Sequence, residues 1–214
     1  MKDKKSLFIT IEGIEGAGKS SLQKLLAEEL RKLGGEVVTT REPGGTKLGE
    51  QIRKLLLGDN SDESAEIDSL TELLLFSADR AQHIAEVIRP ALERGAVVIC
   101  DRFIHSTFAY QGFGRGISLE LLHQLSRIAA SDALRPDLVI LLDLSPQIGL
   151  QRVTEQNRFE KLDLEFHQKV RNGFLELSKD PKNKFVVIDG TLPVGEVFSL
   201  AMKAVKKLLD LPYA

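Results

Sequence analysis

The chain has 214 residues, of which 43% are hydrophobic and 28% charged, a composition that excludes the disordered and membrane-spanning classes. Its single cysteine, Cys100, cannot form an internal disulfide, and 29 basic against 31 acidic residues give a net charge of -2. These values favour a reducing compartment and argue against a protein that coats nucleic acid. The apolar run at residues 7–11 is too short for a signal sequence or a membrane helix, so we expect a cytoplasmic protein with no membrane partner.

Short β-rich runs alternate with helical patterns along the whole chain, which is typical of a parallel sheet flanked by helices. Three of the runs are almost continuously apolar, as expected for strands covered on both faces. We therefore expect an α/β protein with a five-stranded parallel sheet, forming a single domain over residues 1–214. The predicted strands are Leu7–Glu12, Glu36–Thr40, Ala96–Cys100, Asp137–Asp143 and Lys184–Asp189.

Two helical patterns occupy the first half of the chain. Leucines recur at helical spacing over residues 22–33, where they should face the core, and Gly34 with Gly35 should end that helix. A longer pattern covers residues 66–94, and Pro90 should kink it or begin a separate turn. Between these two patterns, the polar stretch at residues 58–65 predicts a loop.

Two further helices are predicted by their first residues. Ser118 can cap a helix that carries an apolar stripe over residues 121–129. Ser145 followed by Pro146 places a cap residue and a first-turn proline in the order that begins a helix.

A glycine-rich segment follows the first strand and precedes the first helix. It fits G-x-x-x-x-G-K-[ST] in the context that a phosphate loop requires. Its amides would converge on phosphate oxygens, Lys19 would reach the β and γ phosphates, and the Ser20 hydroxyl could bind Mg²⁺. The predicted ATP-binding residues are Gly13, Ile14, Glu15, Gly16, Ala17, Gly18, Lys19, Ser20 and Ser21.

A phosphate loop alone is compatible with a kinase, an ATPase, a GTPase or a nucleotide-binding switch without chemistry. A GTPase would need D-x-x-G and N-K-x-D motifs, and neither occurs in the sequence. The segment Asn183-Lys184-Phe185-Val186 lacks the aspartate. The non-catalytic switch stays open at this point.

Charged residues follow two of the predicted strands, at the edge where ligands of parallel sheets bind. Arg41 follows the second strand, and Asp101 with Arg102 follows the third. Arginines at this edge would be available for phosphate, and Asp101 could hold a water bound to Mg²⁺.

Phe76 and Arg80 are four residues apart in the long helical pattern and should share an apolar face. A cation in an apolar stripe needs a partner. The partner would be the carboxylate of Asp79 or Glu72, or else a base that stacks on Phe76 and accepts hydrogen bonds from Arg80. Residues 106–112 add side chains that could form hydrogen bonds with the polar edge of such a ring.

Taken together, these segments resemble the bacterial-type thymidylate kinases, which belong to the P-loop nucleoside monophosphate kinases and phosphorylate dTMP with MgATP. The combination of the phosphate loop with the arginine-glutamate-proline and aspartate-arginine segments is specific to this family. Another nucleoside or nucleoside monophosphate kinase of the same fold is the closest alternative. The matching segments are residues 11–20, 40–46, 76–80, 101–103, 109–112, 142–150 and 158–160.

The resemblance implies a role for each matched position, with Mg²⁺ as cofactor, ATP as co-substrate, dTMP as acceptor and a homodimer as the assembly. The implied catalytic residues are Lys19, Arg102, Arg152 and Arg158, and the implied metal site is Ser20 with Asp101. The implied acceptor-binding residues are Glu15, which would face the sugar 3′-hydroxyl, Arg41, Arg53, Phe76, Arg80, Arg102, Thr107 and Gln111.

The resemblance also implies a short lid at about residues 150–160, with Asn157 where relatives carry aspartate. The phosphate loop has no arginine, so the transition-state cation should come from this lid, and Arg152 and Arg158 both stay open for that role. The four histidines of the chain show no metal-binding spacing, and packing or surface roles are expected for them.

Overall fold

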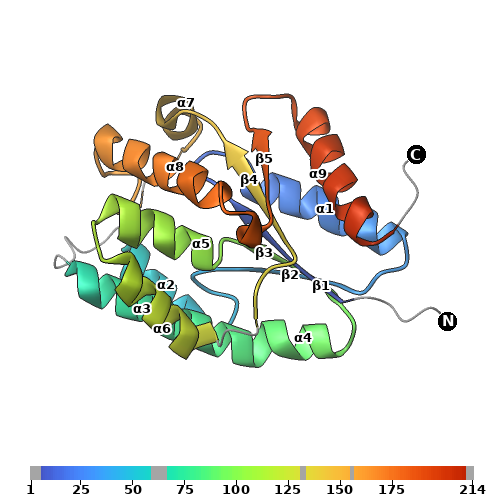
Figure 1. The fold of residues 1–214 in the computed structure, drawn as a ribbon, viewed down its shortest axis with the longest axis horizontal. Coiled ribbons are helices and arrows are strands. Elements are labelled where there is room, and N and C mark those ends of the chain that lie inside the picture. Colours follow the sequence, from blue (N-terminus) through green and yellow to red (C-terminus); the bar gives the residue numbers. More distant parts are fainter. Residues whose placement is uncertain (1–5, 59–66, 131–133, 155–156, 211–214) are drawn as a thin grey trace.

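A computed structural model describes residues 6–58, 67–130, 134–154 and 157–210. Its centre is a five-stranded parallel sheet in the order β2-β3-β1-β4-β5, with helices on both sides (Figure 1). This confirms the predicted α/β architecture, and every strand lies within one residue of its predicted bounds. The strands are β1 (Leu7–Glu12), β2 (Val37–Arg41), β3 (Val97–Asp101), β4 (Leu138–Asp143) and β5 (Phe185–Asp189).

Helices of several lengths connect the strands. The α-helices are α1 (Lys19–Lys32), α2 (Lys47–Leu57), α3 (Ser69–His83), α4 (Arg89–Glu93), α5 (Ile104–Thr107), α6 (Leu119–Ala130), α7 (Pro146–Gln151), α8 (Leu164–Ser178) and α9 (Val194–Leu208). Two π-helices, η1 (Ile84–Ile88) and η2 (Phe108–Gly114), and one 3₁₀-helix, η3 (Pro181–Asn183), complete the set in the described part of the chain. Most of the loop predicted at residues 58–65 lies outside the described residues.

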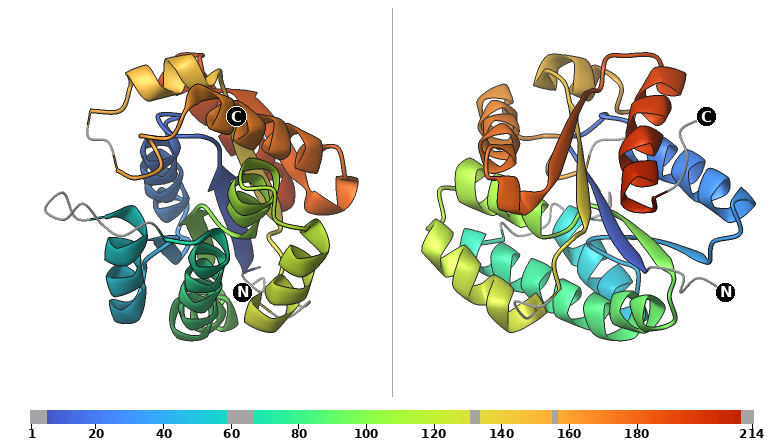
Figure 2. Two further views of the ribbon diagram at one scale, coloured as in Figure 1. Left: turned by 90° about the vertical axis from the view of Figure 1, so that its left-hand side faces the viewer. Right: turned by 45° about the vertical axis from the view of Figure 1, so that its right-hand side comes forward.

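Alternate side chains of β1 enter two different layers of the core, because successive residues of a strand point to opposite faces. Ile9 packs in a cluster with Leu26 of α1 and Val205 of α9, whereas Phe8 packs with Ile88 of η1. Figure 2 shows α1 and α9 side by side on one face of the sheet, and α3, α4 and α6 on the opposite side.

The helix ends follow the predicted signals. Gly34 has a left-handed φ of 81°, and the amide of Gly35 bonds to Leu30 behind the end of α1. Pro90 lies in the first turn of the separate helix α4, after the π-turn η1. The Ser145 side chain accepts from the amide of Ile148 and caps α7.

Two expected core stripes are only partly buried. Leu33, expected in the core, is 51% exposed because α1 ends one residue earlier. On α6 only Leu122 and Ala130 are buried, and Ile128 is 81% exposed. The apolar stripe of α6 therefore turns partly toward solvent.

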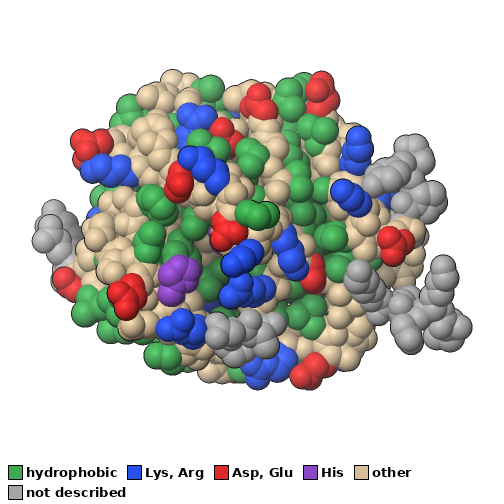
Figure 3. Space-filling model, in the orientation of Figure 1, with side chains coloured by type: hydrophobic (Ala, Val, Ile, Leu, Met, Phe, Trp, Pro, Cys, Tyr) green, Lys and Arg blue, Asp and Glu red, His purple; other side chains and the backbone are tan. Residues whose placement is uncertain are grey.

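The surface carries both signs of charge. On the face drawn in Figure 3, basic side chains gather near the middle, with acidic and apolar side chains around them. Among the described residues there is no helix of the length and apolarity needed to cross a membrane.

Candidate active site

Residues 13–18 join β1 to α1 through a tight loop built around glycine. Gly16 has a φ of 68°, and a Cβ at this position would lie 2.0 Å from the carbonyl oxygen of Gly149 in α7. Only glycine lets the two segments approach so closely. The loop runs into the N-terminus of α1, whose first amides offer positive potential to an anion.

Lys19 is held inside this loop. Its Nζ donates a hydrogen bond to the carbonyl oxygen of Ile14 at 2.8 Å, and the residue is 8% exposed. Burial and the nearby Arg102 charge lower the pKa of Lys19 to about 8, and the Asp101 carboxylate opposes that shift. A bound polyphosphate would favour the charged amine again, since it adds negative charge beside it.

Ser20 and Asp101 meet where α1 begins and β3 ends. The Ser20 hydroxyl donates to Asp101 Oδ2 at 2.8 Å. In the part of the chain that the structure describes, no three His, Cys, Asp or Glu side chains gather into a metal cage. One hydroxyl and one carboxylate suit Mg²⁺, which keeps several waters and takes further ligands from substrate phosphates.

Arg102 links the phosphate loop to the neighbouring cavity. Its backbone has a left-handed φ of 68°, an uncommon conformation for a residue with a side chain. Its guanidinium donates to the Gly13 carbonyl oxygen at 3.0 Å and to Glu15 Oε1 at 3.1 Å, and it lies 5.0 Å from the centre of the Tyr110 ring. The backbone conformation thus turns a strand-end arginine back toward the loop.

Glu12, which the sequence analysis did not assign, holds this turn in place. Its carboxylate accepts from the amide of Phe103 at 2.9 Å and from the Ser106 hydroxyl at 2.6 Å. Burial raises the pKa of Glu12 to about 7, although the Ser106 hydrogen bond and the Arg102 charge lower it. Glu12 therefore fixes the backbone that follows Arg102, and it does not line the cavity.

A cavity of about 290 Å³ opens beside the phosphate loop, at the carboxyl ends of β1, β2 and β3. All eight residues expected to bind the acceptor line it: Glu15, Arg41, Arg53, Phe76, Arg80, Arg102, Thr107 and Gln111. Gly16, Lys19, Ser20 and Asp101 also border it, so the donor and acceptor residues share one space.

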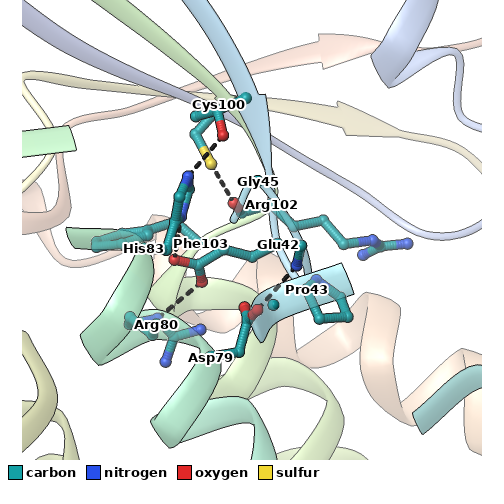
Figure 4. A network of polar contacts seen from close by, with 12 residues as sticks. Glu42, Pro43, Gly45, Asp79, Arg80, His83, Cys100, Arg102 and Phe103 are labelled. Atoms are coloured by element: carbon teal, nitrogen blue, oxygen red, sulfur yellow. Dashed lines mark hydrogen bonds and ion pairs between the residues drawn. The ribbon is translucent and has the colours of Figure 1, made fainter. Parts of the chain in front are cut away.

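Arg80 is fixed by a buried network that Figure 4 shows. Its Nε donates to Glu42 Oε2 at 2.8 Å and its Nη2 to Thr107 Oγ1 at 2.9 Å. Glu42 also contacts His83 Nδ1 at 3.0 Å, and His83 Nε2 lies 2.6 Å from Thr40 Oγ1. The third nitrogen of Arg80, Nη1, has no hydrogen bond to any residue that the structure describes.

The partner of Arg80 differs from both carboxylates that the sequence suggested. Asp79 instead accepts from the amide of Gly44 at 2.9 Å, and burial with the Glu42 charge raises the pKa of Asp79 to about 7. Glu72, two turns earlier on α3, binds Gln111 and not Arg80. The sequence could not show that Glu42, which follows β2, folds against the middle of α3.

Glu72 fixes the amide of Gln111. The carboxylate is fully buried and accepts from Gln111 Nε2 at 2.9 Å, from Arg115 at 3.1 Å and from Arg158 at 2.6 Å. Because Nε2 is held by Glu72, the Gln111 carbonyl oxygen is the atom left to accept from a ligand.

Four aromatic side chains line the cavity: Phe76, Phe103, Tyr110 and Phe159. The rings of Phe76 and Phe159 lie 6.1 Å apart at an angle of 55°. Phe76 was predicted from the sequence, whereas Phe159 was recognised only as part of a family match. A flat ring could stack against either face.

Arg41 and Arg53 add two further cations to the lining of the cavity. Arg41 donates twice to Glu50 at 3.0 Å, and Arg53 donates to the carbonyl oxygen of Pro43 at 2.9 Å. Burial and the Arg41 charge lower the pKa of Arg53. Two cations this close favour an anion between them.

The structure separates the two lid arginines. Arg152 donates to the carbonyl oxygens of Gly190 at 3.0 Å and Gly16 at 3.5 Å, so it lies against the phosphate loop. Arg158 donates to Glu72 and to the carbonyl oxygen of Leu56, on the acceptor side. Neither arginine lines the cavity.

Comparisons with known proteins agree on one family. A family model described as thymidylate kinase matches residues 11–200. The thymidylate kinase of Pseudomonas fluorescens (strain Pf0-1) is 51% identical over 208 residues, covering 96% of this chain and 97% of the relative. That of Deinococcus radiodurans is 49% identical over 194 residues, covering 89% and 92%.

Solved structures agree as well. The crystal structure of thymidylate kinase from Ehrlichia chaffeensis matches with a TM-score of 0.76 at 38% identity, covering 94% of this chain and 98% of that one. The match confirms the P-loop nucleoside monophosphate kinase fold. The chain belongs to the thymidylate kinase family, whose members are kinases that phosphorylate dTMP with ATP.

Proposed function

We propose that the protein transfers the γ-phosphoryl group of MgATP to dTMP, giving dTDP and ADP, and that residues 1–214 form one kinase domain. The observation that carries this proposal is the position of Arg102. Its guanidinium touches the phosphate loop at Gly13 and also lines the acceptor cavity. One cation can therefore reach the phosphates of both substrates.

The reaction joins an oxygen of the dTMP phosphate to the γ-phosphorus and breaks the bond to the β,γ-bridging oxygen, which leaves with ADP. A phosphate monoester is mostly dianionic at neutral pH, since its second pKa is near 6, so no general base is required. The task of the protein is to bring two anions into line and to stabilise the charge on the transferred group. A site rich in arginine and lysine suits that task.

Thymine recognition is assigned to Arg80 and Gln111, with Phe76 as the stacking wall. The free Nη1 of Arg80 would donate to a carbonyl oxygen of the base, and the Gln111 carbonyl oxygen would accept from the ring N–H. Thr107 supports this edge through its hydrogen bond to Arg80. Cytosine has an acceptor nitrogen where thymine has its N–H. In bound dCMP this nitrogen would face the Gln111 carbonyl oxygen, also an acceptor, and no hydrogen bond could form.

On the donor side, Lys19 and the amides of residues 13–21 bind the ATP phosphates. We propose that Ser20 holds Mg²⁺ directly and Asp101 holds it through water, since the two already lie in hydrogen-bond contact. Mg²⁺ held by these residues would supply positive charge that offsets part of the negative charge of the ATP phosphates. Arg41, Arg53 and Arg102 bind the acceptor phosphate.

Residues at about 150–160 act as the lid, and Arg152 supplies its transition-state cation. The support for Arg152 is its contact with the phosphate loop at Gly16. Arg158 is bound to Glu72 and so acts on the acceptor side.

The protein works as a homodimer joined through exposed apolar side chains of α3 and α6. Leu70 and Leu74 lie one turn apart on α3 and are each 48% exposed, and Ile128 on α6 is 81% exposed. The two helices pack against each other, so these side chains can contribute to one surface. Ile128→Glu should shift the protein to the monomer in size-exclusion chromatography with light scattering.

The function is tested by ADP release in a coupled assay with MgATP and eight acceptors: dTMP, dUMP, dCMP, CMP, UMP, AMP, GMP and thymidine. We expect dTMP to give the dominant signal. Preference for another monophosphate would contradict the thymine-binding roles of Phe76, Arg80 and Gln111. ATP binding without acceptor-dependent turnover would favour a nucleotide switch.

We place the enzyme in the cytoplasm because its one cysteine, Cys100, is buried and free.

A further inference from the structure

His167 is a buried histidine that the proposed reaction does not use. It lies in α8, is 0% exposed, and neither ring nitrogen has a hydrogen-bond partner among the described residues. A buried ring nitrogen without a partner costs free energy, because its hydration is lost and nothing replaces it. Such a group calls for a structural or functional reason.

A carboxylate oxygen of Glu15, in the phosphate loop, lies close to this ring. His167 Nδ1 lies 3.4 Å from Glu15 Oε2, although the two atoms lack the alignment of a hydrogen bond. Oε2 is itself buried and also lacks a partner. Two unpartnered atoms that face each other inside the protein need only a small rotation to satisfy both.

The other oxygen of Glu15 has a different environment. Oε1 accepts from the Tyr110 hydroxyl at 2.5 Å and from Arg102 at 3.1 Å, and all three residues line the acceptor cavity. The carboxylate therefore has a front oxygen at the cavity and a rear oxygen toward α8. When an acceptor phosphate draws Arg102 toward itself, a site on Oε1 becomes available for a sugar hydroxyl.

We propose that His167 is a positioning residue for the acceptor sugar: it donates from Nδ1 to Glu15 Oε2 and so keeps Oε1 directed at the 3′-hydroxyl. The inference rests on the proposed function, in which Glu15 faces that hydroxyl. Without the rear contact, the carboxylate can rotate about its last bond, and the front oxygen loses its fixed direction. His167 thus acts through Glu15 and does not touch the substrate.

The test compares two substitutions at this position. His167→Leu removes both nitrogens while keeping an apolar filling, whereas His167→Asn places an amide N–H close to the position of Nδ1. Val170→Ala is the matched control, because Val170 is fully buried one turn along the same helix and its apolar side chain cannot hydrogen-bond to Glu15. Each protein is assayed with dTMP and with 3′-deoxythymidine monophosphate, and its melting temperature is recorded.

We expect His167→Leu to lower kcat/KM for dTMP by about tenfold or more, to leave the KM for ATP within about twofold, and to change kcat/KM for the 3′-deoxy acceptor by less than about threefold. His167→Asn should recover most of the dTMP activity. Equal losses on both acceptors, or losses that follow the melting temperature as in Val170→Ala, would overturn the proposal.

The role of His167 can be tested even if the proposed thymine specificity is wrong. If the wild-type protein prefers another nucleotide, thymine specificity fails, and the same comparison is made with that nucleotide and its 3′-deoxy form. A loss confined to the hydroxyl-bearing acceptor would still support the role of His167.

Discussion

The donor and acceptor sides of the cavity are built in different ways. The phosphate loop is one contiguous segment, and its lysine is held by Ile14, only five residues away. The acceptor wall is assembled from distant segments: Arg80 is held by Glu42, 38 residues earlier, and Gln111 by Glu72, 39 residues earlier. Binding of ATP phosphates therefore depends on local backbone geometry, whereas the choice of base depends on buried carboxylates that hold the base-reading side chains in place.

We expect the largest loss of stability when the carboxylate that holds Arg80 is removed. Glu42→Gln leaves the buried Arg80 without its ion-pair partner, and we expect a loss of about 3 kcal/mol or more in the free energy of unfolding. Urea denaturation of the ligand-free protein measures it. Glu36→Gln is the control, because its pair with Arg94 is about half exposed and should contribute less than about 1 kcal/mol. Equal losses of unfolding free energy in the two variants would show that the buried ion pair of Glu42 with Arg80 does not stabilise this part of the site.

The second prediction tests the residue that joins the two sides. Arg102→Ala should lower kcat by about 10²-fold or more, since it removes a cation from the transferred phosphoryl group. Steady-state assays with saturating dTMP and MgATP measure this, with the exposed Arg94→Ala as control. Turnover near the wild-type rate would show that Arg102 does not stabilise the transition state.

The two lid arginines lie on different sides of the site, Arg152 against the phosphate loop and Arg158 against Glu72. Arg152→Ala should lower kcat by about 30-fold or more, as it removes the cation beside the phosphate loop. Arg158→Ala should mainly raise the KM for dTMP, since Arg158 binds the carboxylate that holds Gln111. The reverse pattern in the same assays would transfer the catalytic role to Arg158.

The smallest effect concerns the 5-methyl group of thymine. A single methyl in an apolar pocket is worth about 1 to 3 kcal/mol, and the cavity here is lined by polar and apolar side chains alike. We expect kcat/KM for dUMP to be about tenfold below that for dTMP when the two are measured separately. Complete rejection of dUMP would reveal a methyl pocket that Phe76 does not explain.

The sequence predicted the fold well because its signals are local. Each strand is a short apolar run, and the first helix ends at a glycine pair, so neighbouring residues determine the element. The stripe on α6 was harder to interpret, because periodicity shows that one face is apolar but not what covers it. Ile128 lies on that face and is exposed in the single chain.

For the site, the sequence identified many of the residues that line the cavity, but not Tyr110 or Glu42, and it missed the residues that hold them. All eight expected acceptor residues share the cavity. Glu12, which fixes the backbone after Asp101 from 91 residues away, gave no signal, since no spacing rule connects two strands. The carboxylates near Arg80 in the sequence, Asp79 and Glu72, are not its partners, because Glu42 after β2 folds against it.

The most direct test of this account is the ratio of kcat/KM for dTMP to that for dCMP, in the wild-type protein and in Glu72→Gln. Glu72 holds Gln111 Nε2, so the wild-type ratio should be at least about 10²-fold and should fall about tenfold or more when the amide is free to turn over. An unchanged ratio in a folded Glu72→Gln variant would contradict the claim that the buried Glu72 carboxylate, by holding Gln111, decides which base the cavity accepts.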